Sequence, residues 1–372
     1  MKIAILETGH FQYALTQSEI FEGCEKIFFT PTYIRNEMLE YSPELCNGKF
    51  YMIENIAKAE KEIIGICNSE NIDLLLISPV FDSYKAVLSL IKNLNCRKII
   101  TTHNINTWFN GRFWSPNSLI DRIVMRNILN SCDFIAVEDF IYAHLKKHNQ
   151  KLFNNYKFLY IPFTIFHERT NKIFFKEDEK LKIVLTGGID IKRRRYEVIL
   201  SVINYFAVNK ANITFSFAGK AVGEYGIWVQ KQLDKANELY PGVASYFSDN
   251  VNTHPELFRK EMETADLVLS TSNITFKGMG TTEYIGKTKP TAAIHDMISF
   301  ELPGLLPVHL EVPENLTGSV FNYTSIDSLK NILSDLIDNP QIINLWKRKA
   351  KENSRHFTAN EIRKMLPLFH TK

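Results

Sequence analysis

The chain has 372 residues, which exceeds the size at which one hydrophobic core keeps growing, so we expect two domains of ordinary size. Lys and Arg number 44 and Asp and Glu number 41, and the resulting charge of +3 excludes a protein that coats nucleic acid by charge alone. Five scattered cysteines without a CxxC pair are typical of reduced thiols rather than of a disulfide framework.

The first predicted strand is the apolar run at residues 2–6, and because the chain opens on it directly, we expect no secretory signal and a cytoplasmic protein. Further strand-like runs follow at residues 26–29, 72–77, 98–102, 133–137 and 157–161. The segments between them, such as 56–67 and 118–129, carry apolar residues at helical spacing. This alternation predicts a parallel sheet covered by helices on both faces over residues 1–165. The longest apolar run, residues 72–81, is shorter than the ~20 residues of a membrane-spanning helix, so we predict no transmembrane segment.

A polar, charged passage at residues 166–180 lacks periodicity and is predicted to link two domains. A second series of strand-like runs occupies residues 181–186, 212–218, 243–247 and 266–270, in a domain that we expect to span 181–340. From Ser325, the predicted cap of the next helix, the pattern is helical, and residues 341–372 are predicted to form C-terminal helices that can pack back on the first domain. The expected fold class is α/β, with two doubly wound Rossmann-like domains facing a central cleft and a C-terminal helical tail.

The most informative local pattern follows the predicted strand at residues 181–186. Gly187 and Gly188 let the backbone approach a ligand closely, and Lys192, Arg193 and Arg194 stand at the start of a predicted helix. Cations there oppose the helix dipole by a few tenths to about 1 kcal/mol each, and a bound anion would compensate. Guanidinium groups also suit phosphate. The pattern predicts a phosphate-binding turn, and the alternative is a solvated charge run.

Four segments together resemble the GT-B glycosyltransferases, especially bacterial polysaccharide-assembly enzymes akin to glycosyltransferase family 4. They are ETGHF at residues 7–11, TTHN at 101–104, GGIDIKRRRYE at 187–197 and EYIGKTKPTAAIHDMISFELP at 283–303. The resemblance covers essentially the whole chain. It implies that a nucleotide-sugar donor binds the second domain and the acceptor the first, without a metal bridged by a DxD motif. The sequence contains no such motif and no His and Cys cluster that we recognise at ligand spacing, so we expect no metal and no other cofactor.

The same resemblance implies the donor contacts. In the retaining family, two glutamates eight positions apart lie near the donor; Glu283 falls on the first position and Thr291 on the second. A hydroxyl gives up the charge-assisted part of the hydrogen bond, so this departure weakens the assignment to the retaining family. Lys287 and Lys289, which lie between these positions, add cations for a diphosphate, and the alternative is that they are ordinary surface lysines. His103 resembles the family histidine that contacts the donor sugar.

His10 is the best candidate for the base that accepts the proton of an acceptor hydroxyl. It follows the first strand, where ligands of α/β sheets bind, and an imidazole titrates in the useful range. Some inverting GT-B enzymes use a histidine in this loop, so the resemblance points the same way. Glu7 would orient His10 or replace it. The alternative for His10 and for His103 is a hydrogen-bonded loop residue.

These patterns predict a glycosyltransferase that moves a hexosyl or related group from a nucleotide-activated donor to a glycan or lipid-linked saccharide in cell-surface polysaccharide synthesis, such as that of lipopolysaccharide or capsule. The expected partners are this donor, this acceptor and, as a peripheral contact, the inner face of the membrane, but not nucleic acid. Two alternatives stay open. One is a nucleotide-sugar epimerase of the same fold, and the other is a non-catalytic protein that binds nucleotide-sugars and supports a partner transferase.

Overall fold

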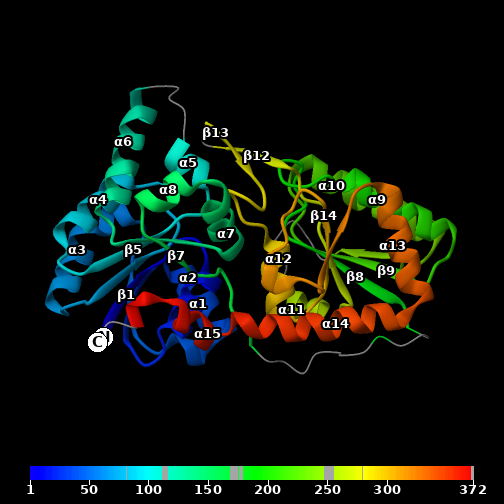
Figure 1. Cartoon of the computed structure of the whole chain (residues 1–372), viewed down its shortest axis with the longest axis horizontal. Coiled ribbons are helices and arrows are strands. Elements are labelled where there is room, and N and C mark those ends of the chain that lie inside the picture. Colours follow the sequence, from blue (N-terminus) through cyan, green and yellow to red (C-terminus); the bar gives the residue numbers. More distant parts are fainter. Residues whose placement is uncertain are drawn as a thin grey trace.

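The computed structural model describes residues 1–80, 82–110, 116–167, 175, 179–246, 255–278 and 280–369. These residues form two α/β domains that lie side by side, each built on a parallel sheet (Figure 1). The expected fold class is therefore confirmed. All five cysteines carry free thiols. Among the described helices, none combines the length and the apolar character needed to cross a bilayer.

The first sheet has seven strands in the order β3-β2-β1-β4-β5-β6-β7. Its strands are β1 (Lys2–Leu6), β2 (Glu25–Thr30), β3 (Lys49–Met52), β4 (Leu74–Ile77), β5 (Arg97–Thr101), β6 (Phe134–Val137) and β7 (Phe158–Tyr160). The central strand β1 pairs in parallel with both β2 and β4, so the strand order reverses at β1. Helices cover both faces of the sheet, which explains why β1 and β4 are apolar along almost their whole length instead of alternating.

The helices of this domain are α1 (Phe11–Ile20), α2 (Thr32–Tyr41), α3 (Ile56–Ser69), α4 (Tyr84–Asn93), α5 (Ile105–Asn110), α6 (Pro116–Ser131), α7 (Asp139–His148) and α8 (Gln150–Asn155). Local signals start some of them; the side chain of Asn55 caps α3 by accepting a hydrogen bond from the Lys58 amide at 2.9 Å. Three of these helices, α1, α5 and α7, begin just beyond the carboxyl ends of β1, β5 and β6. Their N-termini therefore lie at the sheet edge where ligands of such folds bind.

The second sheet has six strands in the order β10-β9-β8-β11-β14-β15, and its strand order reverses at β8. Its strands are β8 (Leu181–Thr186), β9 (Ile213–Ala218), β10 (Ala244–Tyr246), β11 (Leu267–Leu269), β14 (Gly304–Pro307) and β15 (Val320–Tyr323). Its helices are α9 (Tyr196–Val208), α10 (Gly223–Leu239), α11 (Pro255–Glu263), α12 (Ala292–Ser299) and α13 (Ile326–Asp338). A separate antiparallel pair, β12 (Thr275–Gly278) and β13 (Thr281–Tyr284), extends toward α5 of the first domain (Figure 1).

Two C-terminal helices, α14 (Pro340–Ser354) and α15 (Ala359–Met365), run from the second domain back to the first along the lower edge of Figure 1. A buried ion pair between Lys347 Nζ and Asp266 Oδ1, 2.9 Å apart, anchors α14 to the second domain. Arg363 Nε donates to the Ile20 carbonyl at 2.8 Å and anchors α15 to the end of α1. Single-turn helices at Pro43–Cys46, Glu314–Leu316, Arg355–Phe357 and Pro367–Phe369 complete the described elements.

The strands predicted from apolar runs are all present, and no bound differs from its prediction by more than two residues. The predicted cap of α13 is also present, because Ser325 Oγ accepts a hydrogen bond from the Ser328 amide at 3.0 Å. The sequence did not reveal β3, β12, β13, β14 or β15, each of four residues. Length is not the reason, since β7, β10 and β11 are shorter still. The missed runs are less apolar: β3, β12, β13 and β15 contain polar or exposed residues, and β14 has only two apolar residues between Gly304 and Pro307. The domain boundaries stay predictions, and residues 168–174 and 176–178 of the expected linker lie outside the described residues.

Candidate functional site

A cleft of about 700 Å³ lies between the two domains and is lined by residues of both. Phe11 and Phe163 line it from the first domain, and Gly187, Arg193 and His295 line it from the second. Ligands of doubly wound sheets bind at the carboxyl ends of the strands, where the strand order reverses. In this chain the reversals occur at β1 and β8. The turn after β8 lines the cleft with Gly187 and Gly188, and α1, which follows the loop after β1, lines it with its first residue, Phe11. The cleft is therefore the candidate site.

The turn after β8 has the close backbone packing that its glycines predict. Gly187 has a φ of +77°, and a Cβ atom there would collide with the guanidinium of Arg194. A Cβ atom at Gly219, just after β9, would collide with the Gly187 carbonyl. Arg194 is buried, and its Nη1 donates to the Gly188 carbonyl at 2.9 Å. Gly187 and Gly188 thus line the cleft, whereas Arg194 braces the turn; a direct contact of Arg194 with a donor stays a prediction.

The run of cations forms a turn rather than the first turn of a helix. Helix α9 starts only at Tyr196, so the dipole argument for an anion beside Lys192 does not apply. The Lys192 side chain is exposed. Lys287 forms an ion pair with Glu311, with 3.2 Å between Nζ and Oε1. Unlike Arg193, neither lysine is among the residues that line the cleft, and a contact of either one with a donor stays a prediction.

Arg193 and Lys289, in contrast, converge on one aromatic ring. The guanidinium of Arg193 lies 5.6 Å and Nζ of Lys289 lies 4.8 Å from the ring centre of Phe276. Lys289 also donates to Asn104 Oδ1 at 2.8 Å, a contact between the domains. Burial, and then the charge of Arg193, lower the pKa of Lys289 to about 8. Two cations held so close together favour a bound anion, which would relieve their repulsion.

Glu283 lies in a buried hydrogen-bond network that joins the two domains. Its Oε1 accepts from the Thr107 amide at 2.7 Å and from the Thr107 hydroxyl at 2.8 Å. Its Oε2 accepts from the Asn106 amide at 3.1 Å and from the Thr288 hydroxyl at 2.6 Å. These bonds attach β13 to the first turn of α5. The carboxylate is thus occupied by protein donors, and its predicted contact with a sugar donor stays a prediction.

The first loop holds His10 against the rings of His103 and Phe163. Glu7 is buried, and its Oε1 accepts from the Gly9 amide at 2.6 Å and from the His10 amide at 2.8 Å, which shapes the loop. Burial raises the pKa of Glu7 to about 7. Burial, and then the nearby His103, lower the pKa of His10 to about 4. The rings of His10 and His103 lie 5.7 Å apart, so the structure brings these two predicted site residues together. Neutral His10 can accept a proton at neutral pH.

The structure adds a carboxylate that the sequence analysis overlooked. Glu138 is buried directly after β6, and its Oε1 lies 3.2 Å from Nδ1 of His103. Its Oε2 lies 2.8 Å from Nε2 of His295 on α12, so Glu138 connects the two domains. Burial by itself would raise the pKa of Glu138, but His295 and His103 outweigh burial and hold this pKa at about 2. The position of Glu138 at a strand end was the signal that could have identified it.

Helix α12 brings its first turns to the same cleft. Thr291 is buried at the N-cap, with its Oγ1 3.5 Å from Ser272 Oγ, and His295 and Asp296 line the cleft. Burial raises the pKa of Asp296 to about 6. A helix N-terminus beside a glycine turn is well suited to phosphate oxygens. His295 and Asp296 are one helical turn beyond Thr291, and this spacing was available in the sequence.

Comparison with known proteins supports the fold. No protein-family model and no curated protein sequence matches the chain. The chain is similar to the structure of a glycosyltransferase from Rickettsia africae, with a TM-score of 0.63 and 13% identity, covering 98% of this chain and 96% of that one. It is equally similar to Anabaena HepE in complex with UDP, with a TM-score of 0.63 and 12% identity, covering 98% of each chain. A Listeria monocytogenes protein proposed to be a UDP-N-acetylglucosamine 2-epimerase gives a TM-score of 0.56 and 12% identity, covering 94% of this chain and 91% of that one.

These likenesses, together with the two parallel-sheet domains and the cleft between them, define the fold class. The chain has the GT-B fold. Assignment to glycosyltransferase family 4, expected from the sequence, stays a prediction.

Proposed function

We propose that this chain is a glycosyltransferase that moves a sugar from a nucleotide-activated donor to a hydroxyl of a saccharide or lipid-linked saccharide. The observation that carries the proposal is that a candidate proton acceptor and candidate phosphate-binding groups lie around one cleft. The imidazole of His10, whose pKa is lowered to about 4, directly precedes Phe11, which lines the cleft from the first domain. Gly187, Gly188 and Arg193 line the cleft from the second domain, and Lys289 shares the ring of Phe276 with Arg193. Glycosyl transfer needs a proton acceptor on one side and a stabilised leaving diphosphate on the other.

The donor half of the proposal rests on charge and backbone geometry. A diphosphate beside Gly187 and Gly188 would receive the positive charge of Arg193 and Lys289 without a metal. Hydrogen bonds to charged groups contribute about 1.5–3 kcal/mol each, so two good contacts change affinity by roughly two to four orders of magnitude. UDP is the first nucleotide to test, because HepE was crystallised with UDP and also with UDP and glucose.

The transfer half rests on His10. In an inverting reaction the acceptor oxygen attacks the anomeric carbon, and the bond from that carbon to the diphosphate oxygen breaks with its electron pair. The hydroxyl proton passes to the imidazole of His10. Because the pKa of His10 is lowered to about 4 by burial and by His103, a bound diphosphate would raise it toward neutrality through its negative charge. Glu7 holds the loop backbone. Glu138 contacts His103 and would hold this imidazole in place for its proposed contact with the donor sugar.

The acceptor class and the place of action follow from the resemblance to polysaccharide-assembly enzymes. We place the acceptor among the saccharides of cell-surface glycans, used by a cytoplasmic protein at the inner face of the membrane. Transfer of labelled sugar to a lipid-linked saccharide in vesicles, compared with the free saccharide, tests this part separately.

Donor binding is tested by a thermal-shift screen against UDP, GDP, CMP, dTDP and their sugars, because a ligand of the native state raises the melting temperature by mass action. One nucleotide should stabilise the wild type. Arg193→Ala should weaken its binding at least tenfold at unchanged unfolding temperature, and Lys192→Ala, in the same turn, should leave affinity unaltered. Absence of any nucleotide-dependent shift would reject the proposed function.

The role of His10 is tested with the nucleotide identified in this way. His10→Ala should keep donor affinity and lower the rate of transfer by about 10²–10⁴-fold, the range for loss of a general base. Full activity in this variant would remove His10 from the mechanism while leaving the donor site intact.

An epimerase is the second candidate, favoured by two carboxyls whose pKa values lie near neutrality because of burial. They are Asp296, which lines the cleft and has a pKa of about 6, and Glu7, in the loop after β1, with a pKa of about 7. Such groups can exchange protons with a sugar carbon. Incubation of UDP-N-acetylglucosamine without an acceptor decides between the two activities, since an epimerase converts the sugar and a transferase leaves its configuration unchanged.

A further inference from the structure

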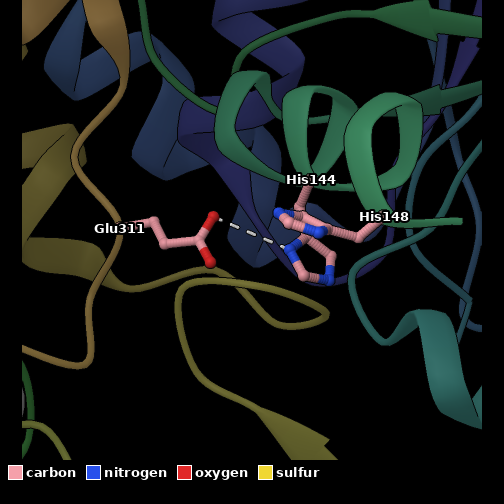
Figure 2. A group of neighbouring side chains, drawn as sticks. All are labelled: His144, His148 and Glu311. Carbon is pink, nitrogen blue, oxygen red and sulfur yellow. Dashed lines mark ion pairs between the residues drawn. The ribbon is translucent and has the colours of Figure 1, made fainter.

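A cluster of three potential metal ligands lies where α7 meets the second domain, outside the cleft-lining residues. His144 and His148 are four residues apart on α7, so their side chains lie on one helix face. Glu311 follows β14 in the second domain. Figure 2 shows the two imidazole rings and the carboxylate gathered at one point, although they come from different domains. All three ligand atoms lie within 4.8 Å of one another.

The distances suit a shared ion better than a direct hydrogen bond. Nδ1 of His144 is buried without a hydrogen-bond partner, and it lies 3.7 Å from Oε2 of Glu311 (Figure 2). This separation is too long for a hydrogen bond. Two ligands placed tetrahedrally about 2.0–2.2 Å from Zn²⁺ lie roughly 3.4 Å apart. His148 and Glu311 are both exposed, so their side chains are free of core packing and can close the remaining distance.

The ligand chemistry selects the class of ion. Two imidazoles and one carboxylate suit a borderline transition metal such as Zn²⁺, whereas Mg²⁺ and Ca²⁺ prefer oxygen ligands alone. Lys287 Nζ lies 3.2 Å from Oε1 of Glu311, which leaves Oε2 directed at His144. Lys287 thus fixes the orientation of the carboxylate, as outer-shell partners of metal ligands do. Its charge at the same time lowers the affinity for a cation.

We propose that His144, His148 and Glu311 bind one divalent transition-metal ion, with a further position open to water, and that this ion fastens the first domain to the second. The sequence analysis, which expected no metal, missed the pair because two histidines four residues apart become a chelate only on a helix and gain their third ligand only from the other domain. Glu138 immediately precedes α7, so the helix that carries the two histidines also carries the contact with His295. A bound ion would therefore favour the arrangement in which this contact forms.

Direct metal binding tests the site. Untagged full-length protein, freed of metal with a chelator, is titrated calorimetrically with ZnCl₂ in a buffer that does not bind zinc. The wild type should bind one equivalent, and Co²⁺ in its place should give the visible absorption of a low-coordinate complex. His148→Ala should lower the affinity at least tenfold, because a ligand is lost. His356→Ala, an exposed histidine on another element, is the matched control and should bind as the wild type does.

Glu311→Gln tests the connection between the domains. It should lower zinc affinity at least tenfold and abolish the zinc-dependent rise in melting temperature, while circular dichroism without zinc matches the wild type. Unchanged affinity in Glu311→Gln would confine the ion to α7 and overturn the fastening role. No zinc binding to the wild type, or equal binding to His148→Ala, would overturn the site and leave a simple ion pair of Glu311 with Lys287. Both experiments are independent of glycosyl transfer.

Discussion

Glu7 and His10 lie three residues apart in one loop, and burial reverses the usual order of their pKa values. The pKa of Glu7 rises to about 7 and that of His10 falls to about 4, because burial favours the neutral form of each group. At neutral pH the imidazole is therefore available as a proton acceptor, while Glu7 lies close to its own midpoint. Groups with such displaced pKa values are concentrated at functional sites, which supports a chemical role for this loop.

The buried carboxyl of Glu7 makes stability depend on pH. Its pKa is raised in the folded state above the usual value of 4.5, so the folded protein binds this proton more tightly, and the stability it contributes at low pH is lost as pH rises toward 7. Glu7→Gln keeps an oxygen for the Gly9 and His10 amides and has no charge to bury. Relative to the wild type, the variant should therefore gain up to about 3 kcal/mol in free energy of unfolding between pH 4 and pH 8.

Urea unfolding at both pH values measures this difference. If the difference in free energy of unfolding between variant and wild type does not change with pH, Glu7 ionises in the folded protein as it does in the unfolded chain.

At the scale of elements, the hairpin of β12 and β13 contacts α5 of the other domain through Thr281, Thr282 and the carboxylate of Glu283. Glu283 satisfies two backbone amides and two hydroxyls around the first turn of α5. A helix start without such acceptors would leave buried N–H groups unpaired. One interdomain contact thus includes the hairpin and α5. The ring of Phe276, which Arg193 and Lys289 approach, belongs to the same hairpin.

Glu283→Gln separates this bracing role from the predicted donor contact. The NH₂ group of glutamine would face hydrogen-bond donors where the wild type has a carboxylate oxygen. We therefore expect the free energy of unfolding to fall by about 1–3 kcal/mol. Nucleotide affinity should remain near that of the wild type. Tyr284→Phe, at the exposed neighbouring position, is the control for hairpin substitution. A loss of donor affinity at full stability would instead identify Glu283 as a donor ligand.

At the scale of the whole molecule, a buried ion pair and the C-terminal helices hold the domains together. Glu138 meets His295 across the junction at 2.8 Å, and α14 and α15 are anchored to opposite domains. Burial would lower the pKa of His295, but Glu138 outweighs burial and raises it. The ion pair of Glu138 with His295 exists only while His295 is protonated, so this contact between the domains depends on pH.

The sign of the resulting pH dependence follows from the two pKa directions. The pKa of His295 is raised, so the stability that its charge contributes is fully present below the usual pKa of histidine. This stability is lost as pH rises through the raised pKa. The contribution of Glu138, whose pKa is about 2, is lost only as pH falls toward that value. We therefore expect the radius of gyration, measured by small-angle X-ray scattering, to increase from neutral to alkaline pH. Glu138→Gln should abolish this increase, and a radius independent of pH in the wild type would contradict it.

The sequence indicated much of the fold because its strands are continuous apolar runs separated by helical periods. It also located the glycine turn, since a backbone that packs as closely as Gly187 against Arg194 and Gly219 excludes side chains. It did not separate Arg193 from Arg194, because adjacent residues in a turn point in different directions that only packing decides. Lys287 was grouped with Lys289 for the same reason, although the structure pairs it with Glu311.

By itself the sequence determined the two parallel sheets, their strand-end loops and the supply of imidazoles and cations, because these depend on local periodicity and on the identity of single residues. Only the tertiary structure decided which of them meet. Three groups of contacts join segments that are distant in the chain. Glu138 contacts both His103 and His295, and Glu283 accepts hydrogen bonds from α5. His144 and His148 lie close to Glu311. Contacts of this kind depend on how two separately formed domains dock, and no local pattern in the sequence encodes that geometry.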